Sequence, residues 1–172
     1  GESVYHFVLR TIPQQFISSL QLEALRLKNQ NSFPFSPKNF VVMIVLIQAL
    51  VCCLAYIFFG GIIFLAYLNQ GIIAILLLEY VNYIEHYGLT RNENEKVSAR
   101  HSWQSDFLPS RFSLIELSRH SDHHNHASKP FHTLQSLNES PILPSGYFGS
   151  FYLALAPSLW FKKVNPIIDQ MK

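Results

Sequence analysis

The longest apolar stretch of the 172-residue chain constrains its fold most strongly. Residues 40–78 are almost wholly apolar, apart from a few polar positions and the pair Gly60-Gly61. About 20 apolar residues in a helix are enough to span the hydrocarbon core of a bilayer. We therefore expect two transmembrane helices, over residues 40–58 and 61–87, with the glycine pair making the turn between them.

Charged side chains avoid most of this stretch and gather at its flanks. All thirteen Lys and Arg residues lie outside residues 39–90, and the acidic residues inside that range are Glu79 and Glu85. The positive-inside rule then places both ends of the helix pair in the cytoplasm. The net charge of +2 is small and scattered, without the basic, aromatic-rich runs that follow a phosphate backbone. We therefore expect no nucleic-acid partner.

The flanking segments are expected to be shorter helices and loops. We predict an amphipathic helix and loop over residues 1–38, a helix over residues 111–126, and an apolar re-entrant or interfacial segment over residues 147–161. Pro157 interrupts the last of these. The expected fold class is an all-α integral membrane protein, a transmembrane helix hairpin with further helices on its cytoplasmic side.

The cluster His120-x-x-His123-His124 is the strongest sign of chemistry in the sequence. On a helix these residues stand at i, i+3 and i+4, so their imidazoles share one face. Converging neutral imidazoles suit Zn, Cu, Fe or Ni. The alternative is a histidine-rich surface loop, since His126 lies close by. Asp122 either accepts the second ring N–H of a ligand histidine, which fixes its tautomer, or is an exposed helix residue.

A second polar group lies at the predicted cytoplasmic end of the second transmembrane helix. Glu79, Asn82 and His86 are spaced at i, i+3 and i+7, on one helical face. Ionisable residues in a membrane helix are costly and indicate function, so His86 is a candidate ligand with Glu79 and Asn82 as candidate supporting residues. Glu85 is expected to face elsewhere and is at best a supporting residue. By spacing alone, His86 and the three-histidine cluster also fit a tetrahedral zinc site.

Two motifs, NYIEHYGL at Asn82–Leu89 and RHSDHH at Arg119–His124, together resemble the bacterial membrane alkane 1-monooxygenases. That family belongs to the histidine-box superfamily of membrane desaturases and hydroxylases. Weaker matches run along the chain: GES-x-Y at Gly1–Tyr5, HSW at His101–Trp103 and LPSGY at Leu143–Tyr147. The sequence departs from the family at Ser118, where Gln is usual, and at Gln104, where Asn is usual; neither position is a ligand in the family.

The resemblance implies a centre of two non-haem iron ions held almost entirely by histidines. Carried over motif by motif, the metal ligands in this chain are His86, His120, His123 and His124. The remaining histidines have no ligand counterpart: His6, His101, His126 and His132. The family's two earlier histidine boxes do not occur here, and the chain begins without Met. We therefore expect it to be the C-terminal portion of one desaturase-like domain, inactive alone.

The activity that the resemblance implies is O2-dependent terminal hydroxylation of n-alkanes to 1-alcohols, with electrons from rubredoxin and rubredoxin reductase. The implied location is the bacterial inner membrane. The protein is expected to cross it several times, surrounded by lipid, with the metal site toward the cytoplasm. One alternative is a related membrane desaturase or a hydroxylase of alkyl side chains on aromatics. An alternative of a different class is a non-redox membrane protein that binds zinc.

Overall fold

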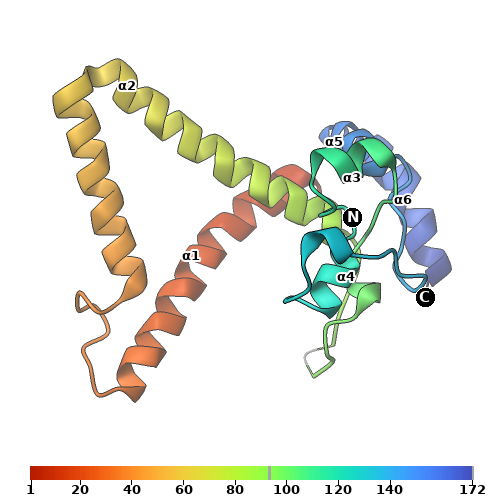
Figure 1. Cartoon of the computed structure of the whole chain (residues 1–172), viewed down its shortest axis with the longest axis horizontal. Helices are drawn as coiled ribbons and strands as arrows, with labels where there is room; N and C mark the ends of the chain where they lie inside the picture. Colours follow the sequence, from red (N-terminus) through yellow and green to blue (C-terminus); the bar gives the residue numbers. More distant parts are fainter. Residues whose placement is uncertain (93, 172) are drawn as a thin grey trace. The chain divides into compact units, whose positions relative to one another are not determined.

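The computed structural model describes residues 1–92 and 94–171, and the residues described form helices and loops without a β-strand. They divide into two compact units. One, the apolar unit, is Val8–Glu79, and the other, the histidine unit, joins Gly1–Phe7 to Tyr80–Lys172. The helices in chain order are α1 (Val4–Asn29), α2 (Phe40–His86), α3 (Leu108–Ser113), α4 (His120–Asn125), α5 (Gly146–Leu155) and α6 (Pro157–Met171) (Figure 1).

The predicted N-terminal helix is present as α1 and begins at Val4. Ser3 starts it, because its carbonyl accepts the N–H of Phe7 at 3.0 Å and its hydroxyl accepts the N–H of His6 at 3.4 Å. Pro13 lies inside the helix without ending it. The helix ends before Asn31, whose φ of 52° is left-handed and does not continue an α-helix.

Helix α2 breaks at the predicted glycine pair. Gly60 has φ 80° and ψ 177°, and the helix changes direction there (Figure 1). Tyr67, after the break, donates a hydrogen bond from its hydroxyl to Gln48 before it, at 2.6 Å. This bond pairs two polar groups within largely apolar arms, which is the arrangement that a water-free environment requires.

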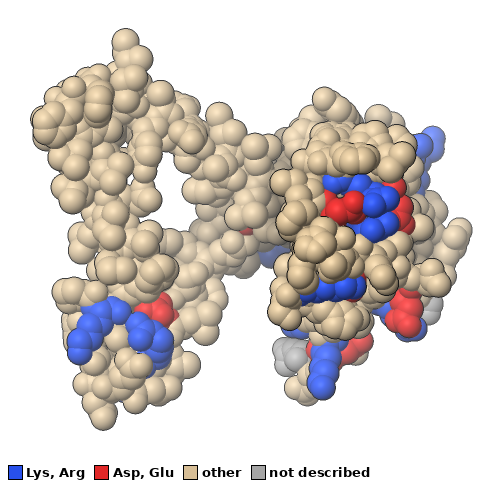
Figure 2. All heavy atoms as spheres, in the orientation of Figure 1, with Lys and Arg blue, Asp and Glu red and all other residues tan. Residues whose placement is uncertain are grey.

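The outer surface of α2 is strongly apolar. Ile62 is 84% exposed and Phe58 is 72% exposed, and many other large apolar side chains of α2 are exposed as well. Figure 2 shows the two arms near the bend without charged atoms on the face in view. An apolar surface of this extent marks contact with lipid or another protein. Helix α2 is also the one described helix that is long and apolar enough to cross a bilayer.

Residues 111–126 do not form the single helix expected. Helix α3 ends at Ser113 and α4 begins at His120, because Ile115 and Glu116 between them have φ values of 51° and 62°. Left-handed residues cannot continue a right-handed helix. The guanidinium of Arg111 holds this bend: its Nε and Nη2 bond the Glu116 carboxylate at distances down to 2.7 Å.

The apolar segment expected over residues 147–161 is two helices rather than one. Helix α5 ends at Leu155, and Pro157 is the first residue of α6, a position that tolerates its missing N–H. Trp160 of α6 is fully buried, with its ring centroid 5.9 Å from that of Tyr83 and 5.4 Å from that of Tyr87. These aromatic contacts pack α6 against the last turns of α2.

Substitution of Gly88 tests this packing. Gly88 has φ 71°, and a Cβ there would lie 2.2 Å from Cδ1 of Ile168 on α6. We expect Gly88→Ala to lower the free energy of unfolding by about 2 kcal/mol, from left-handed strain and overpacking together. Adding Ile168→Val removes the clashing methyl group, so the pair should cost less than the sum of its parts in a double-mutant cycle.

The matched control is Gly71→Ala, since Gly71 lies within α2 with no atom within 4 Å of the added Cβ. That change should be neutral or slightly stabilising by helix propensity. Thermal unfolding of the purified protein in detergent measures all four variants. Equal stability of the Gly88→Ala and Gly71→Ala proteins would contradict the packing described.

Candidate metal centre

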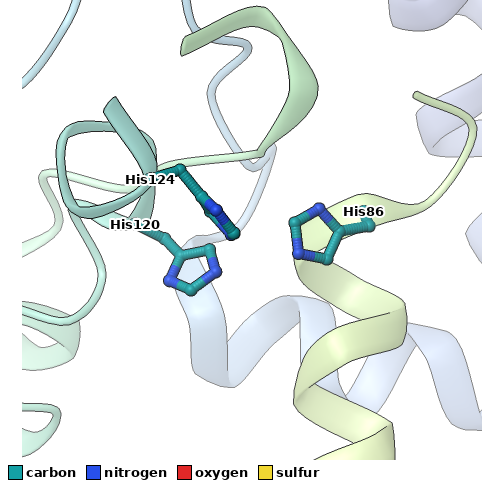
Figure 3. A group of neighbouring side chains, drawn as sticks. All are labelled: His86, His120 and His124. Carbon is teal, nitrogen blue, oxygen red and sulfur yellow. The ribbon is translucent and has the colours of Figure 1, made fainter. Parts of the chain in front are cut away.

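Three imidazoles converge inside the histidine unit. His86 is the last residue of α2, while His120 and His124 stand one turn apart on α4 (Figure 3). One ring nitrogen from each lies within 4.8 Å of the other two. The i, i+4 spacing on α4 places two of the rings on one helical face, as the sequence predicts, and the end of α2 supplies the third. We call these residues the three-histidine group.

A backbone carbonyl fixes the tautomer of His86. Its Nδ1 lies 2.9 Å from the carbonyl oxygen of His101. A carbonyl only accepts hydrogen bonds, so Nδ1 carries the proton and Nε2 keeps a lone pair. Trp103 holds the segment that bears this carbonyl, because its backbone N–H donates to the Glu85 carbonyl and its indole N–H to the Tyr87 carbonyl, both at 2.8 Å. His86 is therefore preset to bind through Nε2.

His120 and His124 each have one ring nitrogen that is buried without a hydrogen-bond partner. These atoms are Nδ1 of His120 and Nε2 of His124. Burial, with further contributions from the neighbouring imidazoles, lowers the pKa of His120 to about 3 and also lowers the pKa of His124. Both rings are therefore neutral near pH 7. Buried polar atoms are normally paired, so unpaired ring nitrogens on clustered neutral imidazoles fit an ion as their missing partner.

His123 lies beside the three-histidine group rather than in it. Its ring centroid is 5.7 Å from that of His120 and 6.1 Å from that of His124. Among the described residues, three donors converge rather than the four of the alternative tetrahedral zinc site. A set of three protein donors leaves coordination positions open, as catalytic metal sites do. The ligand role of His123 stays a prediction.

Glu85 contacts the centre, and the expectation that it faces elsewhere is wrong. Its Oε2 lies 3.1 Å from Nε2 of His120. Its Oε1 accepts a hydrogen bond from the Tyr147 hydroxyl at 2.9 Å. The long glutamate side chain reaches the far nitrogen of His120 from the same end of α2 that supplies His86. The sequence does not fix this, because neighbouring helix positions usually face different ways.

Asp122 has a different role from either that we expected. Its side chain is 1% exposed, and it accepts hydrogen bonds from Lys129 Nζ at 2.5 Å, from the backbone N–H of Gln135 at 2.7 Å and from His126 Nδ1 at 3.2 Å. Burial raises the pKa of Asp122, but these bonds outweigh it and hold the pKa below its ordinary value. Asp122 is therefore neither an exposed residue nor a partner of the three-histidine group; it anchors the loop after α4.

The other two candidate supporting residues lie along α2. Glu79 belongs to the apolar unit, where it accepts hydrogen bonds from Thr11 at 2.5 Å and from Gln15 at 2.9 Å, both on α1. These bonds stabilise the packing of α1 on α2. Asn82 is half-buried on α2 in the histidine unit. A supporting role at the metal centre for either residue stays a prediction.

Two residues that serve the centre were not singled out from the sequence. Tyr147 bonds Glu85, and His101 orients His86 through its backbone carbonyl. Both lie in motifs already noted, LPSGY and HSW, but a motif match does not say which atoms act. A backbone carbonyl has no sequence signal at all, since every residue carries one.

Comparison with known proteins agrees with the motif resemblance. The model of the fatty acid desaturase family matches residues 1–153. The chain is 38% identical to alkane 1-monooxygenase 2 of Alcanivorax borkumensis over 98% of its own length and 46% of that protein. It is 37% identical to alkane 1-monooxygenase 1 of Pseudomonas aeruginosa, over 96% and 45% of the two chains.

A more distant relative is the xylene/toluene monooxygenase hydroxylase component XylM of Pseudomonas putida, at 28% identity over 94% of this chain and 43% of that protein. The chain thus spans about half the length of the curated relatives it matches. The predicted resemblance to alkane 1-monooxygenases is confirmed.

Removal of single imidazoles tests the three-histidine group. We expect His124→Ala to weaken Co²⁺ binding by more than about 100-fold, beyond the usual cost of losing a residue that only orients a ligand. The same loss should follow His86→Ala and His120→Ala. Competition with a chelator, measured on the native protein in detergent, gives the affinities.

The control is His126→Ala, since that side chain is 61% exposed and lies outside the group, although it follows the same helix. We expect it to keep the affinity of the parent protein. If His126→Ala and His124→Ala weakened binding equally, the ion would not be bound where the three rings converge.

Proposed function

Because the chain belongs to the fatty acid desaturase family, we propose that it forms part of a membrane-bound non-haem iron monooxygenase that converts n-alkanes to 1-alcohols with O2. The observation that carries this proposal is the three-histidine group, with its buried and unpaired ring nitrogens. The reaction class follows the names of the relatives, which include alkane 1-monooxygenases from several bacteria.

The residues that would hold the ions are His86, His120, His123 and His124. We propose two non-haem iron ions, with the three-histidine group on one and His123, which lies outside that group, as the candidate ligand of the other. Bound iron supplies oxidation of an unactivated C–H bond by O2, which no side chain can perform. The protein supplies three converging donors in a largely buried setting, which favours a catalytic ion with open positions over a closed structural zinc site.

The three-histidine group converges without an ion. The His101 carbonyl sets the proton position on His86, and the helical i, i+4 spacing sets the separation of His120 and His124. Fixed donors of this kind bind an ion without a further cost of ordering the side chains. Burial keeps the rings of His120 and His124 neutral, so protons compete weakly for the lone pairs that an ion would use.

For the substrates and partners, we propose an n-alkane and O2, electrons from rubredoxin and rubredoxin reductase, and surrounding membrane lipid. The apolar exposed surface of α2 supports contact with lipid, in which an alkane also dissolves. We place the protein in the bacterial inner membrane, crossing it more than once, with the centre toward the cytoplasm. The basic residues that flank α2 support this orientation, and a soluble electron donor could then reach the centre.

An alkyl-aromatic hydroxylase is the second candidate function. The observation that favours it is the 28% identity to the xylene/toluene hydroxylase component. A membrane desaturase is a further alternative within the same family. The three differ in product, so one assay separates them.

Product analysis tests the activity. The native protein, supplied with rubredoxin, its reductase and NADH, should convert octane or hexadecane to the 1-alcohol, with one oxygen atom from labelled O2. Elemental analysis and Mössbauer spectroscopy should find iron. His124→Ala should abolish the product, because it removes a donor, while His126→Ala should leave the product intact.

Other products would change the assignment. Oxidation of xylene but not octane would favour the alkyl-aromatic hydroxylase, and desaturated lipid alone would favour the desaturase. Stoichiometric zinc without iron, and without any O2-dependent product, would contradict the monooxygenase proposal.

Cysteine labelling tests the orientation. In a Cys52→Ala/Cys53→Ala background, a single cysteine at Gly61→Cys lies next to the break in α2, and one at Lys96→Cys lies beyond its basic end. Gly61 accepts a side chain, because a Cβ added there would lie 3.9 Å from the nearest atom. A membrane-impermeant maleimide should label Gly61→Cys in spheroplasts and Lys96→Cys in inverted vesicles. Labelling of both from one side would refute two crossings.

A further inference from the structure

A group of large apolar side chains stays exposed on the histidine unit, around α3 and along α5. Their exposed fractions run from 44% to 81%, and we call them the α3–α5 surface: Phe107, Phe112, Phe148, Tyr152 and Leu155. The last three are spaced at i, i+4 and i+7 on α5, so they share one helical face. An apolar face of this kind marks a place where lipid or another molecule is bound.

The start of α5 packs against α3, which brings the two parts of this surface together (Figure 1). The backbone N–H of Tyr147 donates to the Ser110 hydroxyl at 3.1 Å. A Cβ added to Gly146 would lie 3.1 Å from the ring of Phe107. A different face of α5 carries the buried residues Tyr147, Ser150 and Ala154. Helix α5 is therefore largely apolar on both faces, and the described residues cover one of them.

Helix α5 is attached to the part of α2 that directly follows the long apolar stretch. Tyr80 comes two residues after Leu78, where that stretch ends. Its hydroxyl donates to the Phe151 carbonyl at 2.5 Å, and the two ring centroids lie 4.2 Å apart. Because the apolar stretch of α2 is the proposed membrane span, these contacts hold α5 at the level where hydrocarbon meets the lipid head groups.

The charges that follow α5 have one sign. Between Glu139 and Asp169 the sequence contains no acidic residue, and its basic residues there are Lys162 and Lys163, both exposed on α6. Lysines attract the anionic head groups of a membrane surface. Exposed aromatic and leucine side chains with lysines close by are typical of a helix that lies in the membrane interface. Charge and apolar exposure together favour lipid over an acidic or neutral protein as the occupant.

We propose that the α3–α5 surface lies in the interfacial layer of the bilayer, with its apolar side chains among the acyl chains and with Lys162 and Lys163 at anionic head groups. This inference rests on the membrane location in the proposed function. The ten residues of α5 are about 15 Å long, half of the hydrocarbon thickness of about 30 Å. The helix therefore lies along the membrane surface and does not cross it, so the apolar segment expected over residues 147–161 is interfacial rather than re-entrant.

Fluorescence quenching in vesicles tests the inference. The native protein, in the Cys52→Ala/Cys53→Ala background, receives a single cysteine at Tyr152→Cys or Phe112→Cys, which is labelled with an environment-sensitive dye. It is then reconstituted in vesicles of phosphatidylcholine and phosphatidylglycerol. We expect emission at shorter wavelength than in water, quenching by a nitroxide on the upper acyl chain of a lipid, and little quenching by iodide.

The matched control is Arg100→Cys, in the 3-10 turn Ala99–His101, which contacts α4. The side chain of Arg100 is 71% exposed, close to the 72% of Tyr152. Its exposure is thus similar, but it lies outside the α3–α5 surface. We expect the label there to be quenched by iodide and not by the lipid-borne nitroxide.

Neutral substitutions test the part assigned to the lysines. Lys162→Gln/Lys163→Gln should reduce the lipid quenching at Tyr152→Cys in vesicles that contain phosphatidylglycerol, because the attraction to anionic head groups is lost. In vesicles of phosphatidylcholine alone the same double substitution should have no effect. Unchanged quenching in the anionic vesicles would contradict the contact between these lysines and the head groups.

Two other results would overturn the inference. Iodide quenching as strong at Tyr152→Cys as at Arg100→Cys would show that the surface faces water. Protection from iodide without lipid quenching would show that protein covers it. Phe112→Cys decides where the Tyr152→Cys protein does not insert. Lipid quenching in a protein that hydroxylates no alkane would refute the proposed function alone, and formation of the 1-alcohol without lipid quenching would refute this inference alone.

Discussion

The candidate metal centre depends on the hydrogen bonds that hold the end of α2. A helix ends with carbonyls that have no partner within the helix, and these must be satisfied elsewhere. Here the backbone N–H of Trp103 satisfies the carbonyl of Glu85 in the last turn, and its indole N–H satisfies that of Tyr87 just after the helix. Because Trp103 is fully buried, this attachment fixes the neighbouring His101 carbonyl against His86. The bonds of Trp103 that hold the end of the helix thus also fix the tautomer of His86.

The same loop also positions α4. The Ser102 carbonyl accepts hydrogen bonds from the Ser121 hydroxyl at 2.9 Å and from the Ser140 hydroxyl at 2.7 Å, and all three serines are buried. Ser121 lies between His120 and His124 on α4, so this contact sets the distance from α4 to the end of α2. A short helix of six residues has little stability of its own, and such tertiary bonds must hold it.

Gln104 shows how a departure from the family's pattern is accommodated. Its side-chain amide donates to the Leu137 carbonyl at 2.7 Å and its side-chain oxygen accepts the Leu137 N–H at 3.0 Å. Both polar atoms of the buried side chain are therefore satisfied, at a position where Asn is usual in alkane 1-monooxygenases. The residue joins two loops through these bonds and is not one of the three-histidine group.

The sequence by itself determined the features that depend on local spacing. The apolar stretch predicted two transmembrane helices, over residues 40–58 and 61–87, and the structure has one long apolar helix, α2, with a break at Gly60 of the predicted glycine pair. The i, i+4 spacing placed His120 and His124 on one face. The motifs identified the family. Each of these follows from helix periodicity or from a residue's own backbone preference, both of which are readable within a few positions.

Only the tertiary structure decided what lies around those donors. In the structure, the predicted helix over residues 111–126 is broken at Ile115 and Glu116. The side chain of Glu85 lies beside His120, and that of Asp122 bonds the loop after α4. Tyr147 meets Glu85 across 62 residues of sequence, and His101 orients His86 with a backbone atom. Such contacts depend on how distant segments pack, so they cannot be predicted from helix periodicity or from the type of a single side chain. The sequence predicted the candidate donors, and the fold determined which of them converge and what surrounds them.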